Sequence, residues 1–283
     1  MKHTRIAACL AALLCAAAAG AATAPAAPAL FPGVKSVLWI GAHPDDEVFL
    51  SPLLGHLCLD EHLKCSLLVA TRGEAGHCLL PDGCRPDLAT VRSAEMAKAA
   101  KLLKARLTLW DLEDGGAAAD GSAGAWDTAS GGHEALLTNL AAHIAAAQAD
   151  LVLTFDPRHG STCHPDHRAI GRLVVEAVAR AASRPMLYFV ETRLEQRESP
   201  FTVTFPAAAT AKASAFAFDA NLPLASTHQA AWQILLQDLE AHPSQFDARL
   251  RRAVRAIGPR GRAVFLGPAE LLLRSSAVAN CGQ

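Results

Sequence analysis

The stretch that decides the fold is Val37-Leu38-Trp39-Ile40-Gly41-Ala42-His43-Pro44-Asp45-Asp46-Glu47. Its first four residues are apolar and predict a buried strand. The pentapeptide from His43 to Glu47 then puts one imidazole and three carboxylates at the end of that strand. Such a cluster is costly to remove from water unless a cation or a network of protons compensates its charge. The stretch therefore predicts a buried strand with a functional site directly behind it.

A second polar cluster, His164-Pro165-Asp166-His167, also comes after an apolar run, Leu151-Val152-Leu153-Thr154-Phe155. Elsewhere, strand-like segments alternate with segments of helical periodicity. We expect strands at 36–41, 67–70, 107–110, 151–155 and 186–190, and helices at 87–105, 134–148 and 167–183. This alternation favours an α/β fold with a mainly parallel sheet and helices on both faces. Ligand sites of such sheets lie beyond the carboxyl ends of the strands, so the two clusters predict one shared site.

The pattern changes after residue 191. Short apolar runs near 200–205 and 214–218 predict additional C-terminal strands, and residues 225–240 predict a further helix. The segment 114–132 is rich in Gly, Ala, Ser and Asp, which predicts a surface loop at the border of the site. Neither an internal repeat nor a linker indicates a second domain, so residues 31–283 are expected to form one domain.

The N-terminal residues have the features of an export signal. Lys2 and Arg5 precede an uncharged Ala/Leu-rich stretch from residue 6 to residue 22, which ends in small residues. This pattern predicts a signal peptide over residues 1–22 and a periplasmic or secreted protein, with a membrane anchor as the alternative interpretation. No stable membrane span is expected after the signal is removed. The net charge of −1 and the lack of a basic run argue against nucleic-acid binding.

The cysteines agree with export. Apart from the two in the signal region, the chain has an even set: Cys58, Cys65, Cys78, Cys84, Cys163 and Cys281. Cysteines in an oxidising compartment usually pair, and Cys78 and Cys84 bracket a Pro-Asp-Gly turn. Cys58 with Cys65 is a second expected disulfide, and Cys163 and Cys281 are the two that remain. A zinc ion bound by cysteines is the rival interpretation, which the lack of a CxxC pair disfavours.

The two polar clusters together have the donor types of a divalent metal site. Histidine and carboxylate suit zinc or another divalent transition metal, and three protein ligands leave one position open in a catalytic site. His43, Asp46 and His167 could supply these ligands. Asp45 would then act as the general base for the attacking water.

Two residues of the second cluster have supporting roles in this hypothesis. His164 could stabilise or protonate the tetrahedral intermediate, and Asp166 could orient an imidazole. Spacing alone does not fix the assignment among these groups. The alternative interpretation is structural: the aspartates after Pro44 cap a helix N-terminus, and the histidines lie on a solvated loop. Two such clusters in one chain favour the shared site.

The motifs resemble those of a known family. The strand followed by GAHPDDE at 41–47, TRGEAG at 71–76 and CHPDH at 163–167 are similar to motifs of the PIG-L/LmbE-like family of zinc-dependent N-acetylglucosaminyl deacetylases. Weaker similarities are Arg-x-x-Glu at 92–95, WDLEDG at 110–115 and HPSQ at 242–245. The resemblance implies a Rossmann-like fold and the removal of acetyl groups from N-acetylglucosamine-type substrates.

The resemblance also implies roles for individual residues. The implied zinc ligands are His43, Asp46 and His167, the general base is Asp45, the intermediate-stabilising group or acid is His164 with Asp166 in support, and the substrate contact is Arg92. Some relatives carry a tyrosine just before the second motif. This chain has Ser161, Thr162 and Cys163 in that neighbourhood, so the role of that tyrosine has no counterpart here.

These observations lead to one functional expectation and two alternatives. We expect an exported, zinc-dependent hydrolase that removes an N-acetyl group from an acetylamino sugar or its conjugate. Its partner would be a small-molecule or glycan substrate. The alternatives are a non-catalytic carbohydrate-binding protein that retains the metal site, and a metal-dependent hydrolase of another amide or ester. The sequence does not fix the oligomeric state.

Overall fold

The structure is a computed structural model, and it describes residues 29–158, 160, 162–190, 216–218, 223–257 and 263–268. Contacts within the chain define a compact unit from Gly33 to Gln283, and the segment Met1–Pro32 is a separate unit. The signal peptide expected at residues 1–22 and the strand expected at 200–205 lie outside the described residues.

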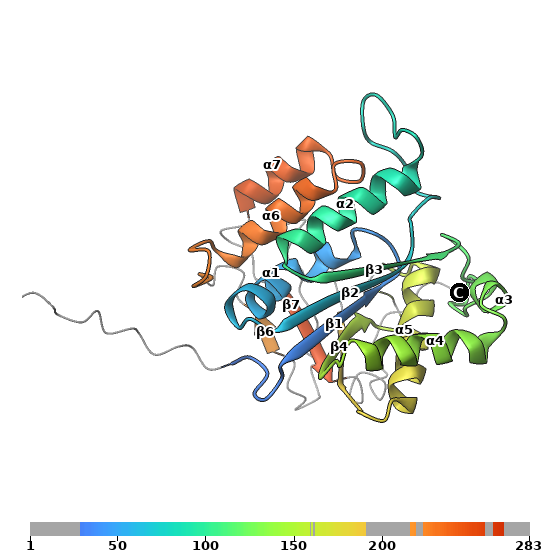
Figure 1. The fold of residues 1–283 in the computed structure, drawn as a ribbon. Coiled ribbons are helices and arrows are strands. Elements are labelled where there is room, and N and C mark those ends of the chain that lie inside the picture. Colours follow the sequence, from blue (N-terminus) through green and yellow to red (C-terminus); the bar gives the residue numbers. More distant parts are fainter. Residues whose placement is uncertain are drawn as a thin grey trace, which may run out of the picture. The chain divides into compact units, whose positions relative to one another are not determined.

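Seven strands form one sheet in the described part of the chain, in the order β3-β2-β1-β4-β5-β7-β6 (Figure 1). Their bounds are β1 (Ser36–Gly41), β2 (Lys64–Thr71), β3 (Arg106–Leu112), β4 (Leu151–Phe155), β5 (Met186–Val190), β6 (Phe216–Phe218) and β7 (Ala263–Pro268). Strands β1 to β5 are parallel, whereas β7 runs antiparallel to both β5 and β6. The predicted Rossmann-like α/β class is confirmed, and β6 is the additional strand expected near 214–218.

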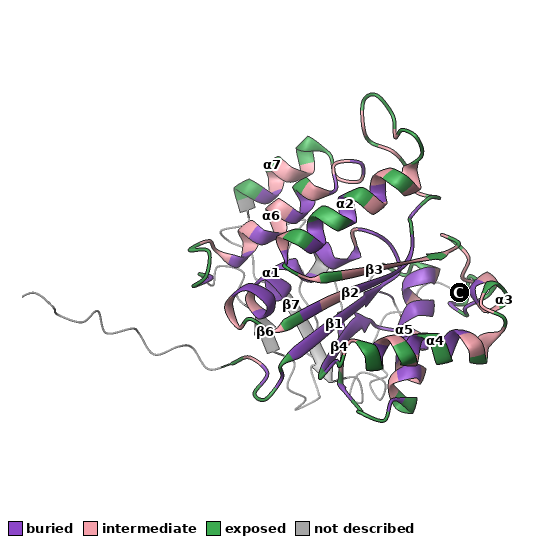
Figure 2. Ribbon diagram, viewed as in Figure 1, coloured by how far each residue is buried: buried purple, intermediate pink, exposed green. Residues whose placement is uncertain are grey.

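Strands β1 and β4 form the centre of the sheet. Every residue of both strands is buried, which explains why each reads as a continuous apolar run rather than an alternating one (Figure 2). Trp39 of β1 packs edge-on against Phe155 of β4, with ring centroids 5.2 Å apart. The opening stretch of the chain therefore forms the strand on which both halves of the sheet are assembled.

Helices cover both faces of the sheet (Figure 1). One layer contains α1 (Ser51–Gly55), α2 (Leu88–Leu102), α6 (Ala231–Ala241) and α7 (Ala248–Ile257), and the other contains α4 (His133–Ala146) and α5 (Pro165–Arg180). The remaining elements are short: η1 (Asp46–Leu50), η2 (His56–Asp60) and α3 (Ala125–Ala129). Helix α3 lies inside the segment 114–132, which was expected to be a loop throughout.

The C-terminal part differs most from the prediction. Helix α6 begins at Ala231 instead of residue 225, because the preceding residues form a turn that Asp60 holds. The Asp60 carboxylate accepts hydrogen bonds from the backbone N–H groups of Ala225 and Ser226, at 3.0 and 2.9 Å. Helix α7 and strand β7 were not predicted. Helix α7 is rich in arginine, but Leu250 and Val254 lie four residues apart on one face and pack against Leu239 of α6.

Two of the expected disulfides are formed. Cys58 is bonded to Cys65, and Cys78 is bonded to Cys84. Cys163 is disulfide-bonded as well. Its expected partner, Cys281, lies outside the described residues.

The connections between the central strands place a topological switch point at β1. From β1 the chain continues to β2 on one side, whereas β4 lies on the other side of β1. Loops that follow β1 and β4 therefore leave the sheet in opposite directions, which is the position where ligands bind in such folds. Both polar clusters of the sequence lie where the chain leaves these strands, partly in the loops and partly in the first turns of η1 and α5.

Helix α5, which carries the second cluster, approaches β4 very closely. A Cβ atom added at Gly171 would lie 2.5 Å from the carbonyl oxygen of Phe155 and 3.1 Å from backbone atoms of Pro157. Because those neighbours are backbone atoms, they cannot move aside without displacing the strand end. A glycine at this position therefore fixes the distance between the helix that carries His167 and the sheet.

We expect Gly171→Ala to lower the free energy of unfolding by about 1–3 kcal/mol, because overpacking against backbone is costly. The loss should occur although alanine is the better helix former by about 1 kcal/mol. Urea denaturation of the purified protein measures this change. Ala179→Gly at an exposed position of the same helix is the matched control and should lose only the helix-propensity term. A Gly171→Ala variant as stable as the parent would contradict the close approach.

Candidate metal centre

The turn after β1 is organised by one carboxylate. Asp46 accepts hydrogen bonds at its Oδ2 atom from the backbone N–H groups of Ala42 and His43, both at 2.7 Å. These bonds fold the turn back onto the end of β1. Gly41 leaves room for this, since a Cβ atom there would lie 3.0 Å from the Asp46 Cβ atom. The other carboxylate oxygen, Oδ1, is left to face the second cluster.

His167 comes from the first turn of α5 and is held in one orientation. Its Nδ1 atom lies 2.8 Å from the carbonyl oxygen of Gly160, and its ring stacks on Phe155 with centroids 4.1 Å apart. A carbonyl oxygen only accepts, so Nδ1 must carry the hydrogen of the neutral ring. The Nε2 atom therefore presents a bare lone pair, 3.0 Å from Oδ1 of Asp46.

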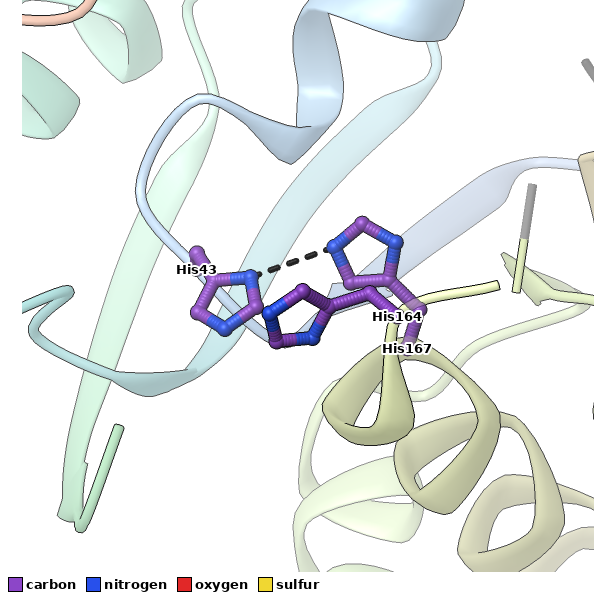
Figure 3. Close-up of side chains that lie close together, drawn as sticks. All are labelled: His43, His164 and His167. Carbon is purple, nitrogen blue, oxygen red and sulfur yellow. Dashed lines mark hydrogen bonds between the residues drawn. The ribbon is translucent and has the colours of Figure 1, made fainter. Parts of the chain in front are cut away.

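His43 is held in the same manner by two carboxylates. Its Nε2 atom lies 3.0 Å from Oδ1 of Asp114 and 3.2 Å from Oδ2 of Asp166. Both oxygens accept, so Nε2 carries the hydrogen and Nδ1 of the neutral ring is bare. This Nδ1 atom lies 3.1 Å from Nε2 of His167 (Figure 3). It also lies 3.7 Å from Oδ1 of Asp46.

When both rings are neutral, these contacts make three lone pairs converge on one point. The separations of the three donor atoms of His43, Asp46 and His167 are 3.0, 3.1 and 3.7 Å. Ligands of a tetrahedral zinc ion are about 3.3–3.6 Å apart when each bond is about 2.0–2.2 Å long. All three residues are buried: the exposed fraction is 7% for His43, 2% for Asp46 and 5% for His167. The arrangement fits a small cation, which would compensate the repulsion between the three lone pairs of the neutral rings and the carboxylate.

The charges around this point also favour a cation. Burial lowers the pKa of His43, but the carboxylates of Asp114, Asp166 and Asp46 outweigh it and hold the pKa well above its usual range. Burial raises the pKa of Asp46, but the imidazoles of His167 and His43 bring it well below its ordinary value. The protein therefore stabilises positive charge at the point where the three donor atoms meet.

Asp166 connects this centre to the loop after β3. Its carboxylate accepts from the backbone N–H groups of Gly115 and Ala117, at 2.7 and 3.0 Å, in addition to its contact with His43. It is thus placed as expected for a carboxylate that orients an imidazole. Asp114 has the same contact with His43 and was expected only at the border of the site. Asp114 lies just beyond the carboxyl end of β3, and this position was the signal in the sequence that could have placed it at the site.

His164 lies at the rim of the centre. It is the N-cap of α5, where its Nδ1 atom accepts from the backbone N–H of Asp166 at 3.2 Å. The side chain is exposed, and its ring meets the His43 ring edge-on with centroids 4.8 Å apart. Partial desolvation, followed by repulsion from His43 and His167, lowers the pKa of His164. Because Nδ1 of His164 accepts a hydrogen bond, the hydrogen of its neutral ring is on Nε2, at the exposed side of the centre.

The three histidines also form an alternative ligand set. Nitrogen atoms of His43, His164 and His167 lie within 4.8 Å of one another, which is a looser arrangement than the set with Asp46.

Asp45 lies beside the centre but has different partners. Its Oδ2 atom is 3.1 Å from Nη2 of Arg92, and its side chain remains 18% exposed. Burial raises the pKa of Asp45 to about 6, with Arg92 acting in the opposite direction and Asp46 adding to the rise. A partly exposed carboxylate with such a pKa can take up and release a proton near neutral pH.

Arg92 is more enclosed than a typical substrate-binding residue. It is 4% exposed, and besides Asp45 its guanidinium binds the carbonyl oxygens of Pro44 at 2.6 Å and Gly73 at 2.8 Å. A Cβ atom at Gly73 would lie 2.1 Å from Nη1, so the TRGEAG motif needs a glycine there to admit the guanidinium. The expected contact of Arg92 with substrate stays a prediction. Ser161 and the adjoining His159 lie outside the described residues.

Solved structures with a similar fold include N,N'-diacetylchitobiose deacetylase from Pyrococcus horikoshii. That protein is 19% identical, with a TM-score of 0.59 over 87% of this chain and 88% of that chain. The 4-carboxy-2-hydroxymuconate hydratase GalB from Pseudomonas putida is also similar, at 14% identity and a TM-score of 0.54 over 88% of this chain and 100% of that chain. At such identities the similarity shows the fold alone, and the hydratase means that the fold does not determine the reaction.

Sequence similarity is more informative. A curated relative, 1D-myo-inositol 2-acetamido-2-deoxy-alpha-D-glucopyranoside deacetylase 3 from Catenulispora acidiphila, is 30% identical over 163 residues, which is 52% of this chain and 45% of the relative. The chain thus spans about half the length of the curated relatives that it matches. Residues 38–178 match the family model "PIG-L: GlcNAc-PI de-N-acetylase". The matched region runs from β1 into α5 and includes both polar clusters, and on this ground the chain belongs to the PIG-L family.

Proposed function

We propose that this protein is a metal-dependent N-deacetylase that hydrolyses the acetyl group of an acetylamino sugar or its conjugate. The observation that carries the proposal is the meeting of three bare lone pairs next to a partly exposed carboxylate of raised pKa. The family description and the printed name of the curated relative both refer to removal of an acetyl group from a glucosamine unit. Together they favour this reaction over hydration or a purely structural metal site.

The proposed metal ligands are His43, Asp46 and His167, and the proposed ion is zinc. Two nitrogens and one carboxylate oxygen at these spacings suit zinc better than the hard cations magnesium and calcium, which prefer oxygen ligands. The carboxylates of Asp114 and Asp166 would fix the His43 ring from the opposite side. Such outer carboxylates raise the basicity of a ligating imidazole.

The chemistry needs one base, one acid and an electrophile. When bound, a divalent ion acts as a Lewis acid that polarises the acetyl carbonyl and makes water more acidic. Asp45 takes the proton of the attacking water, and Arg92 keeps its carboxylate in place. His164 donates a hydrogen bond from Nε2 to the oxygen of the tetrahedral intermediate, from the exposed side of the centre. The proton that Asp45 took from water passes to the amine nitrogen as the C–N bond breaks, so that acetate and a free amine leave.

We also propose that the protein acts outside the cytoplasm. The N-terminal signal pattern and the disulfides among the described cysteines support an oxidising compartment. In the ranges that the structure describes, no helix has both the length and the apolar character needed to cross a membrane. The proposed substrate class is accordingly an exported or envelope glycan, or a secreted acetylated metabolite.

We expect Asp45→Asn to reduce acetate release by about 100- to 10,000-fold, because the amide cannot accept the proton of the water. The metal content should stay at the parent level, since Asp45 contacts Arg92 and none of the three proposed ligands directly. Acetate release from a panel of N-acetylglucosamine conjugates measures the effect. Glu134→Gln, a change at a carboxylate 78% exposed on α4, is the matched control and should behave as the parent. An Asp45→Asn variant of parental rate would show that another group is the base.

The ligand set can be tested separately from activity. Removal of the ion with a chelator should abolish acetate release, and zinc should restore it. Asp46→Ala and His167→Ala should lower the metal content, measured by elemental analysis, from one ion per chain towards zero. His164→Ala should keep the ion and lose turnover. If His164→Ala lost the ion while Asp46→Ala retained it, the looser set of three imidazoles would be the site instead.

A further inference from the structure

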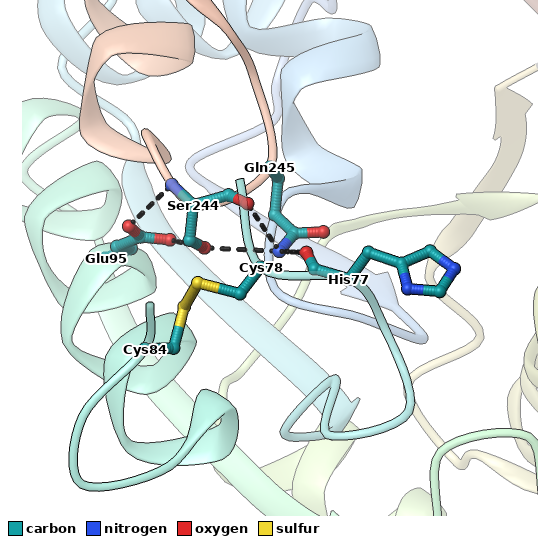
Figure 4. Close-up of a disulfide and its surroundings, with 6 residues drawn as sticks. All are labelled: His77, Cys78, Cys84, Glu95, Ser244 and Gln245. Atoms are coloured by element: carbon teal, nitrogen blue, oxygen red, sulfur yellow. Dashed lines mark hydrogen bonds between the residues drawn. A yellow bond between two sulfur atoms is a disulfide. The ribbon is translucent and has the colours of Figure 1, made fainter. Parts of the chain in front are cut away.

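A short segment after α6 contacts the surroundings of Asp45 although it lies far outside the matched family region. The segment is His242-Pro243-Ser244-Gln245. Ser244 donates from its backbone N–H and its hydroxyl to Glu95 of α2, at 3.0 and 2.5 Å (Figure 4). Gln245 donates to the carbonyl oxygen of His77, in the loop that the Cys78–Cys84 disulfide closes, at 3.0 Å. The segment thus joins α2 and the loop after β2.

The first residue of this segment reaches the opening pentapeptide itself. His242 donates from Nε2 to Oε1 of Glu47 at 2.6 Å, and both residues are fully buried. The other carboxylate oxygen of Glu47 accepts the backbone N–H of Asp45 at 3.2 Å. A continuous pair of hydrogen bonds therefore runs from the end of α6 through Glu47 to the backbone of the proposed base.

The backbone of Asp45 needs such support. Its φ angle of 104° lies in a region that residues other than glycine rarely adopt and that costs about 1–3 kcal/mol. This conformation separates the two adjacent carboxylates, because Asp45 contacts Arg92 whereas Asp46 faces His167. If the backbone relaxed to an ordinary conformation, the Asp45 carboxylate would leave this position. The Glu47 carboxylate opposes that relaxation by holding the Asp45 N–H group.

The charges are consistent with an imidazolium–carboxylate pair. Burial lowers the pKa of His242, but Glu47, Asp238 and Asp45 outweigh it and raise the pKa to about 9. Burial, followed by the charge of Glu47, raises the pKa of Asp238 well above its usual range. His242 therefore carries a positive charge at neutral pH and compensates Glu47, the charged acceptor that Asp45 requires.

We propose that Glu47 and His242 are positioning residues: His242 orients Glu47, and Glu47 fixes the backbone of Asp45, so that the end of α6 sets the place of the catalytic base. The proposal rests on the proposed function of Asp45. It gives a role to two residues that the sequence-based assignment of ligands, base and acid does not include. It also explains why a catalytic turn at residues 43–47 depends on a segment about 195 residues further along the chain.

The test combines three variants with two readouts. His242→Leu removes the donor, His242→Gln keeps a neutral donor of similar reach, and Ser244→Ala removes a buried hydrogen bond of the same segment that does not lead to Asp45. The first readout is the exchange rate of the Asp45 backbone amide by NMR. We expect at least tenfold faster exchange in His242→Leu, partial recovery in His242→Gln, and the parental rate in Ser244→Ala.

The second readout is the kinetics of acetate release by the metal-loaded protein. His242→Leu should lower kcat at least tenfold with KM and metal content within about twofold of the parent, and His242→Gln should recover part of the loss. Equal losses in Ser244→Ala and His242→Leu, or parental amide exchange in both His242 variants, would overturn the proposal. If His242→Leu does not fold, Glu47→Gln takes its place. A parent that releases no acetate, with the exchange effect present, would refute the proposed function and leave the positioning link standing.

The same pair predicts a dependence of stability on pH. The pKa of His242 is about 9 in the folded state and 6.5 as its ordinary value, with Glu47, Asp238 and Asp45 as the charged groups that face it. A raised pKa means that the stabilisation is complete below about pH 6.5 and is lost as the pH rises towards 9. Urea denaturation should therefore show the stability difference between parent and His242→Gln shrinking across this range. A constant difference would contradict a charged His242.

Discussion

The rest of the site depends on where two hydrogens are bound. Nδ1 of His167 donates its hydrogen bond to the carbonyl oxygen of Gly160. Nε2 of His43 donates to the carboxylates of Asp114 and Asp166. The two remaining nitrogens are bare and face Oδ1 of Asp46. Three lone pairs at such distances would repel each other, so the folded protein favours a positive charge at this point, either a proton on His43, as its raised pKa indicates, or a metal ion in its place.

The fold makes this meeting possible by bringing four adjacent strand ends together. The loops after β1 and β4 supply the three facing donors, and the loops after β2 and β3 supply Gly73 and Asp114. Gly171 sets the distance between α5 and β4, and with it the reach of His167. The two adjacent carboxylates of the opening pentapeptide have different partners: Asp46 contacts His167, and Asp45 contacts Arg92.

Much of the fold could be predicted because the central strands are buried on both faces. Strands β1, β4 and β5 occupy the predicted residues, since continuous apolar runs mark their ends sharply. Strands β2 and β3 extend beyond their predicted ends. Helix α6 was predicted to start too early, because local periodicity does not reveal that Asp60 holds the preceding turn.

The site was predictable only in part. The residues that meet at the centre come from two motifs of unusual composition, and the sequence indicated them before the structure brought them together. The contacts of Asp114 with His43 and of His242 with Glu47 join positions far apart in the chain, 195 residues in the second case. Such contacts depend on the packing of whole layers, and no local pattern encodes them. Glu47 has no role in the assignment made from the sequence, whereas in the structure it is buried and contacts both His242 and the backbone of Asp45.

The most direct test of the central claim is anomalous diffraction at the zinc absorption edge from crystals of the zinc-loaded protein. We predict one peak per chain, about 2.0–2.2 Å from Nδ1 of His43, Oδ1 of Asp46 and Nε2 of His167. A peak bound through His164 in place of Asp46, or no peak between these three side chains, would contradict the account.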